Sequence, residues 1–338
     1  MPNRISLASV ATIGVLAFGL EPVVHEILGH AVVCWLTGGK ILLISSTALQ
    51  TASASRLVPA AGPLANILFG LAALTLLRVL STQQNANAHA RTDASADTTA
   101  AAPAASGVTR ISLTLLVLYF FAFANLFLAT GYILYSGLIN FGDFAAVIDG
   151  LRPAWLYRAA LVVIGALGYR YGIAQAARCL AQLLACAHTS PASATPASPP
   201  PSAPLNSTLL QTSPPQSPTL PAASLAPSLP AARRIIHTAC FAGGALFLLS
   251  SCLNPISPSL IFYDGLSGTI GLTLGFFLAL TDLRQSQRAT PQNSAAQNST
   301  SQAPAPEIEI PLNLPLTITA AIFAAAFLIF MGKGIRLP

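Results

Sequence analysis

Two histidines and an acid lie close together in an apolar stretch near the N-terminus. His25 is followed directly by Glu26, and His30 comes five residues after His25. Neutral imidazoles are common zinc ligands, and a neighbouring carboxylate can take a proton from a water that the metal activates. These residue types therefore predict a zinc site with His25 and His30 as ligands and Glu26 as the general base.

The spacing of the two histidines differs from the usual one. The common motif H-E-x-x-H separates its histidines by four residues, which is about 40° around an α-helix. A separation of five residues turns the second imidazole by about 140° on an ideal α-helix. A π-bulge at Gly29 would absorb the extra residue and bring the two rings together. The alternative interpretation is a buried polar network that joins helices.

The chain around this cluster has the composition of a membrane protein. Of its 338 residues 54% are hydrophobic and only 8% are charged, whereas soluble domains carry about a quarter charged residues. Since a spanning helix needs about 20 mostly apolar residues, we expect an all-α, polytopic integral membrane protein with about six to seven transmembrane helices, placed in the cell's inner or plasma membrane. The expected spans are residues 5–36, 60–80, 111–137, 154–172 (with a possible extension to 185), 235–253, 260–280 and 314–331.

Polar, low-complexity stretches divide the apolar segments into units. Tracts rich in Pro, Ser, Ala and Gln cannot bury enough apolar surface to offset the entropy of ordering, so they predict disordered loops. The expected units are 1–80 with the first two core helices, 81–109 as a loop, 110–186 with the third core helix, an Asp-bearing turn and a following helix, 187–232 as a linker, 233–282 with two transmembrane helices, 283–311 as a loop and 312–338 with the last helix.

The basic residues bear on the orientation and on the partners. The net charge of +6 is spread over the loops and forms no basic stripe, so we expect no nucleic-acid partner. With seven spans, more Lys and Arg residues lie on the side of the N-terminus and of the three loops. The positive-inside rule therefore favours a cytoplasmic N-terminus, which places His25 in the half of its span away from the cytoplasm.

Two motifs in this part of the chain resemble a known family. Residues 25–31, His-Glu-Ile-Leu-Gly-His-Ala, look like the HELGHA signature of the site-2 protease family of intramembrane zinc metalloproteases (peptidase family M50), with one residue inserted. The longer spacing is similar to the HELLGH motif of the dipeptidyl peptidase III family. Residues 61–66, Ala-Gly-Pro-Leu-Ala-Asn, resemble the segment that opens the next core helix of site-2 proteases, and they follow a glycine pair at 38–39. The resemblance covers roughly residues 20–80.

The resemblance implies a three-helix metalloprotease core and further site residues. The family's third metal ligand is an aspartate in a turn after a later core helix, for which Asp143 is favoured and Asp149, which keeps an Asp-Gly dipeptide, is the alternative. Asn66 would position the substrate backbone. The alternative interpretation of Asn66, of equal weight, is a structural one: a helix start or a hydrogen bond between helices.

The implied function is an intramembrane zinc metalloendopeptidase that cleaves a transmembrane or membrane-associated polypeptide. Glu26 would act on a zinc-activated water and pass its proton to the leaving amine. Two other functions are compatible with the same residues. One is a transporter with an intramembrane His/Glu metal or proton relay. The other is a site-2-protease-like scaffold that the inserted residue has made inactive.

Overall fold

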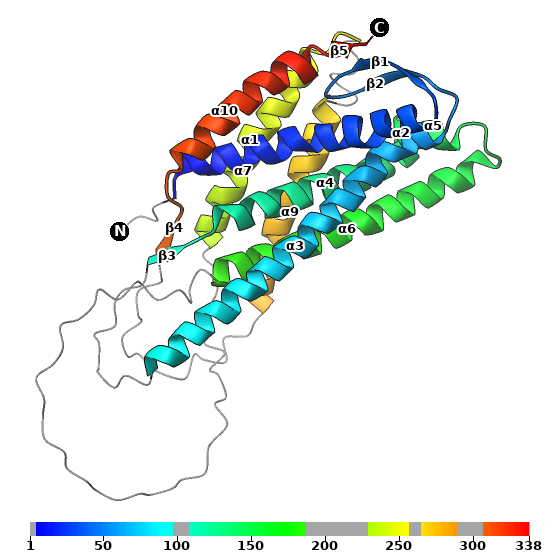
Figure 1. The fold of residues 1–338 in the computed structure, drawn as a ribbon. Helices are drawn as coiled ribbons and strands as arrows, with labels where there is room; N and C mark the ends of the chain where they lie inside the picture. The colour runs from blue at the N-terminus through cyan, green and yellow to red at the C-terminus, as the bar shows by residue number, and fades with distance from the viewer. Residues whose placement is uncertain (1–4, 97–107, 187–228, 257–264, 290–306, 338) are drawn as a thin grey trace, which may run out of the picture.

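Six helices are long and apolar enough to cross a membrane in the computed structural model, which describes residues 5–96, 108–186, 229–256, 265–289 and 307–337. The expectation of an all-α, polytopic membrane protein is thereby confirmed (Figure 1). The six spans are Leu7–Leu36 (α1 Leu7–Pro22, η1 Val23–Ala31 and α2 Val32–Leu36), Leu57–Gln84 within α3 (Leu57–Ala96), α4 (Leu113–Ile139), Ala154–Ala185 within α6 (Ala154–Cys186), α7 (Leu229–Cys252) and Leu314–Gly332 (α10 Leu314–Phe327 and η3 Leu328–Gly332).

Two small sheets mark the two ends of the helix bundle. At the end that we call the hairpin end, β1 (Lys40–Ile44) pairs in antiparallel fashion with β2 (Leu49–Ala52) and with β5 (Ile335–Arg336), in the order β2-β1-β5. At the opposite end, β3 (Val108–Arg110) pairs in parallel with β4 (Glu307–Glu309). The backbone N–H of Ser6 donates to the carbonyl of Ile310, so the start of α1 lies at this opposite end as well.

A seventh segment runs between the same two ends. After α7 the Asn254 amide donates to Ser45 and Thr47 in the β1–β2 turn, so the chain is then at the hairpin end. The strand β4 returns it to the opposite end. The helix α9 (Ser267–Ala289) lies between these points and packs against α4, α6 and α7. It is not among the six apolar spans, since its last third carries charged residues such as Asp282 and Arg284.

Several expected boundaries differ from the structure. The helix α3 continues to Ala96, so the expected loop at 81–109 was wrong for residues 81–96. This stretch is rich in alanine, the residue with the highest helix propensity, and it extends a helix that is already nucleated. The longer alternative for α6, to residue 185, is confirmed.

The other two expected loops are also shorter than predicted. The helix α7 begins at Leu229, inside the expected linker 187–232. Between 283 and 311, α9 continues to Ala289 and Glu307–Glu309 form β4. The remaining parts of the three loops, residues 97–107, 187–228 and 290–306, lie outside the described residues.

Aromatic side chains hold the middle of the bundle together. Phe276 of α9 contacts Phe18 of α1 and Phe120 and Phe127 of α4, with ring centroids 5.1 to 6.1 Å apart, and all four side chains are fully buried. Such aromatic pairs stabilise a fold beyond the area that they bury. These contacts therefore fix α1, which continues into the segment that carries His25 and His30, relative to α4.

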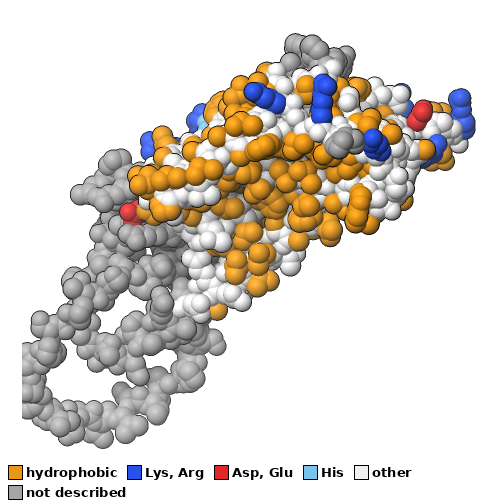
Figure 2. All heavy atoms as spheres, turned by 45° about the horizontal axis from the view of Figure 1, so that its top comes forward, with side chains coloured by type: hydrophobic (Ala, Val, Ile, Leu, Met, Phe, Trp, Pro, Cys, Tyr) orange, Lys and Arg blue, Asp and Glu red, His pale blue; other side chains and the backbone are white. Residues whose placement is uncertain are grey.

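The outer surface is suited to lipid. Large apolar side chains on the outside of α3, α6 and α10 are exposed, among them Leu68, Leu167 and Ile322. Figure 2 shows hydrophobic side chains over most of the visible face, with the few charged side chains near its margins. Trp35 and Trp155 are both more than 70% exposed at the hairpin end, where indole rings suit a membrane–water boundary.

The path of the chain predicts that its two termini lie on opposite sides of the membrane. Seven passages between the ends place Ile5 at one end and β5 at the other, and the excess of Lys and Arg predicts a cytoplasmic N-terminus. Epitope tags on the two termini should differ in protease accessibility in intact cells. A tag inserted within 290–306 should behave like the N-terminal one. Equal protection of both terminal tags would contradict seven passages.

Candidate metal centre

The helix that carries His25 and His30 changes from α-helical to π-helical winding around these two residues. Val23–Ala31 form a π-helix between two α-helical segments. Because a π-helix bonds residues five apart, His25 and His30 lie on the same face of it. Their rings meet edge to face with centroids 4.7 Å apart, and the two Nε2 atoms are 3.2 Å apart. The expected distortion is thus confirmed, and it extends over the whole segment instead of a single bulge.

The π-helix begins directly after Pro22, which has no backbone N–H and therefore cannot continue the α-helical bonding pattern. The other side of the π-helix packs against α3, where Gly29 of the π-helix meets Gly62 of α3. A Cβ on Gly29 would lie 2.6 Å from the Cα of Gly62, and a Cβ on Gly62 would lie 2.7 Å from Nε2 of His25. Only glycine permits this approach of the two backbones. The Gly62-Pro63 segment therefore forms the floor under both imidazoles.

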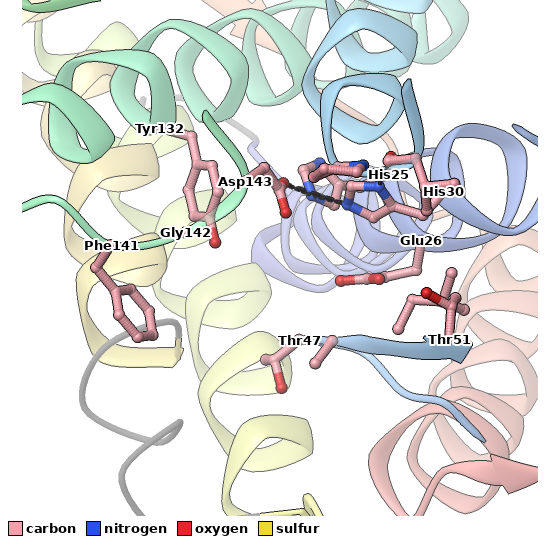
Figure 3. A pocket seen from close by; sticks show the side chains of 13 residues that line it. His25, Glu26, His30, Thr47, Thr51, Tyr132, Phe141, Gly142 and Asp143 are labelled. Carbon is pink, nitrogen blue, oxygen red and sulfur yellow. Dashed lines mark hydrogen bonds and ion pairs between the residues drawn. The ribbon is translucent and has the colours of Figure 1, made fainter. Parts of the chain in front are cut away.

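The third member of the cluster comes from the turn after α4. This helix ends at Ile139, Asn140 and Gly142 take positive φ angles of 57° and 87°, and the short helix α5 (Asp143–Ile148) begins at Asp143. The turn places Oδ2 of Asp143 3.1 Å from Nε2 of His25 and 3.2 Å from Nε2 of His30. In Figure 3 the Asp143 side chain points toward both rings.

The two candidate aspartates are thereby separated by the structure. Asp143 joins the histidines, whereas Asp149 is exposed and its backbone carbonyl accepts a hydrogen bond of 2.8 Å from Arg56. This bond ties the Asp143–Gly150 segment to the start of α3. Arg158 of α6 donates to the carbonyls of Gly137 and Leu138 at the end of α4, so the turn is held from both sides.

The three ligand atoms fit a metal ion. Nε2 of His25, Nε2 of His30 and Oδ2 of Asp143 form a nearly equilateral triangle with sides of 3.1, 3.2 and 3.2 Å. A tetrahedral ion with bonds of about 2.0 Å separates its ligand atoms by about 3.3 Å. Nδ1 of His30 donates to the Val58 carbonyl at 2.6 Å, which leaves the lone pair of Nε2 directed at the centre of the triangle.

The surroundings of Asp143 determine whether its carboxyl is ionised. His25 and His30 are 6% and 5% exposed. Burial by itself raises the pKa of the Asp143 carboxyl, but the charge of His30 in its protonated form, and the hydrogen bonds that both rings donate when Nε2 carries a proton, lower the pKa below its usual range. The carboxylate is therefore ionised, as a metal ligand must be.

A cavity of about 340 Å³ opens beside the triangle. Glu26 lines this cavity next to the two histidines, and it is almost fully buried. The other walls come from the hairpin, the start of α3, the end of α4 and the turn after it, through Thr47, Ala48, Leu49, Thr51, Val58, Pro59, Tyr132, Phe141, Gly142 and Asp143. Its size is that of a site for a small ligand or a few residues of a peptide.

Asn66 forms a buried hydrogen bond to the first span. Its side-chain amide donates to Oε1 of Glu21 at 2.5 Å, and both side chains are fully buried. Asn66 is not among the residues that line the large cavity. A hydrogen bond between helices, one of the two interpretations open at the sequence level, is thus its observed contact, and substrate positioning by Asn66 stays a prediction.

Sequence reasoning missed some residues of the site altogether. Tyr132 lines the cavity and packs edge to face on the His25 ring, with centroids 5.8 Å apart. The hairpin residues Thr47 and Thr51 form another wall. No spacing rule connects these residues to His25, since they are brought there by the packing of α4 and of the hairpin.

No protein-family model, curated protein or solved structure matches the chain. The function is therefore inferred from the geometry of the centre.

Loss of a ligand predicts loss of the metal. His25→Ala, His30→Ala and Asp143→Asn should each lower the bound metal from one ion per chain to well below it, as measured by elemental analysis of the purified protein. Asp149→Asn, a matched change six residues away, should leave the content unchanged because its carboxylate is outside the triangle. Metal loss in Asp149→Asn with retention in Asp143→Asn would contradict this assignment.

The Glu21–Asn66 pair predicts strong coupling between two helices. Asn66→Leu leaves a buried carboxyl without its donor, so the free energy of unfolding should fall by about 1–3 kcal/mol. Adding Glu21→Leu removes the carboxyl as well and should recover most of the loss. A double-mutant cycle, measured by unfolding in detergent, tests this coupling. Additive effects of the two changes would mean that the hydrogen bond contributes nothing.

Proposed function

We propose that the protein is an intramembrane zinc metalloendopeptidase. The observation that carries the proposal is the convergence of His25, His30 and Asp143 on one point, with Glu26 in the same cavity. Two imidazoles, one carboxylate and an adjacent glutamate are the residues that zinc hydrolases use. The resemblance of the two sequence motifs to site-2 proteases supports the same function.

A bound zinc ion and the protein's own residues would contribute different parts of the chemistry. When bound, a zinc ion supplies Lewis acidity and lowers the pKa of a water molecule. His25, His30 and Asp143 would hold the ion, and the Val58 carbonyl orients the His30 ring through its hydrogen bond at 2.6 Å. Glu26 would take the proton of the attacking water and pass it to the leaving amine. The Gly62 floor keeps side chains away from the face on which the two rings meet.

The walls of the cavity suit an extended polypeptide. The strand β2 is one of the two edge strands of the sheet β2-β1-β5, and its residues Leu49 and Thr51 line the cavity. An edge strand can pair with an added peptide through main-chain hydrogen bonds. A peptide bond in a helix is sterically shielded, so a transmembrane substrate would unwind locally, and the edge of β2 would hold the unwound segment beside the metal.

Glu26→Gln tests the function directly. Proteoliposomes containing the zinc-loaded protein and a panel of single-span membrane proteins should yield cleavage products, detected by mass spectrometry. Glu26→Gln should retain zinc and lose about 10²- to 10⁴-fold in cleavage rate, the usual contribution of a general base. Glu309→Gln makes the same change in β4 at the opposite end of the bundle and should cleave normally.

The other outcomes separate the competing functions. Unchanged cleavage by Glu26→Gln would exclude Glu26 as the base. Absence of cleavage by zinc-loaded wild-type protein would favour an inactive scaffold. Metal or proton flux across the liposomes that Glu26→Gln abolishes would favour a transporter.

A further inference from the structure

Tyr132 occupies a distinctive position in the cavity. It lies on α4, seven residues before the end of that helix, and lines the large cavity together with His25, Glu26 and Asp143. A second, smaller cavity beside Glu21 is lined by Tyr132, His25 and Glu26 as well. Tyr132 is thus one of few residues that border both spaces around the general base.

The phenol ring is held by the elements that carry two of the ligands. It packs on the His25 ring with an interplanar angle of 76°. Its far end lies against Gly142, the residue before Asp143, because a Cβ on Gly142 would come within 2.9 Å of the Tyr132 hydroxyl oxygen. The positive φ of Gly142 and its missing side chain leave room for the hydroxyl at the wall of the cavity.

Glu26 and Tyr132 border the same two cavities beside the histidines. In Figure 3 the Tyr132 ring descends from α4 with its hydroxyl beside Gly142, and Asp143 lies between it and the two histidines. The Glu26 carboxylate lies below the two histidine rings in this view, with its oxygens directed toward the side on which Tyr132 lies. A peptide carbonyl bound in this cavity beside the two histidines would therefore have both the carboxylate and the phenol as neighbours.

We propose that the Tyr132 hydroxyl donates a hydrogen bond to the scissile carbonyl oxygen during the hydrolysis proposed above. Water adds to the carbonyl carbon as Glu26 takes its proton, and the π electrons of the C=O bond move to the oxygen. The hydroxyl stabilises that negative charge without giving up its proton. The electron pair then re-forms the C=O bond as the C–N bond breaks, and the proton on Glu26 goes to the leaving amine.

Other hydroxyls of the cavity fit this role less well. Thr47 accepts a hydrogen bond from Asn254, which fixes it to the hairpin end. Thr51 belongs to the strand β2, where we place the substrate backbone. A phenol, with a pKa of about 10, is also a stronger hydrogen-bond donor to a developing oxyanion than an aliphatic alcohol.

The test distinguishes the contribution of the Tyr132 hydroxyl from that of its ring. Tyr132→Phe keeps the packing on His25 and removes only the oxygen, and Tyr135→Phe makes the same change one turn later, at a residue that does not line either cavity. Zinc content and thermal stability should match the wild type in both variants. Tyr132→Phe should lower kcat by about 100-fold with little change in KM, as removal of one oxyanion donor does, while Tyr135→Phe should leave both unchanged.

A binding measurement makes the test independent of cleavage. The probe is a phosphinic dileucine analogue, whose tetrahedral, charged phosphinyl group mimics the transition state of peptide hydrolysis. Its affinity should fall at least tenfold in Tyr132→Phe and stay constant in Tyr135→Phe. Equal kcat and equal affinity in Tyr132→Phe and wild type would overturn this inference alone. Wild-type protein that holds zinc but neither cleaves nor binds the analogue would overturn the proposed function as well.

Discussion

The backbone contact between Gly29 and Gly62 is the constraint on which the rest of the centre depends. Histidines five residues apart share a face only where the helix is wound as a π-helix, and a π-helix lacks the favourable packing of an α-helix. Here α3 supplies a glycine floor that supports the rewound segment and a carbonyl, that of Val58, that orients His30. The five-residue spacing of the two histidines is thus accommodated by tertiary contacts, and their rings still meet.

Buried ionisable groups in a membrane segment are costly unless each finds a partner. In this chain the cost is offset locally. Asp143 meets both histidines, and Glu21 accepts a hydrogen bond from Asn66 one turn beyond Gly62 along α3. Both pairings join the segment Glu21–His30 to another part of the fold. They therefore fix this segment in the bundle and give Glu21, His25 and His30 polar contacts.

The two ends of the bundle are built differently, and the difference suits the site. The hairpin end carries β1, β2 and β5 together with the Asp143 turn, and all of them border or support the large cavity. The opposite end ties the start of α1 to β3 and β4 and leaves the aromatic cluster around Phe276 in between. The cavity therefore lies at one end of the bundle, while the middle of the bundle stays packed.

The sequence by itself determined the membrane class and most of the spans, and it singled out the histidine pair, Glu26 and Asp143, because composition, periodicity and short motifs are local properties. It also predicted the π-helical distortion, since the angle between residues five apart is a property of one helix. Tertiary structure alone decided that Asp143 and not Asp149 reaches the histidines, that Asn66 bonds Glu21, and that Tyr132 and the hairpin wall the cavity. These contacts join residues up to 118 positions apart, and such distances are set by how helices pack in three dimensions.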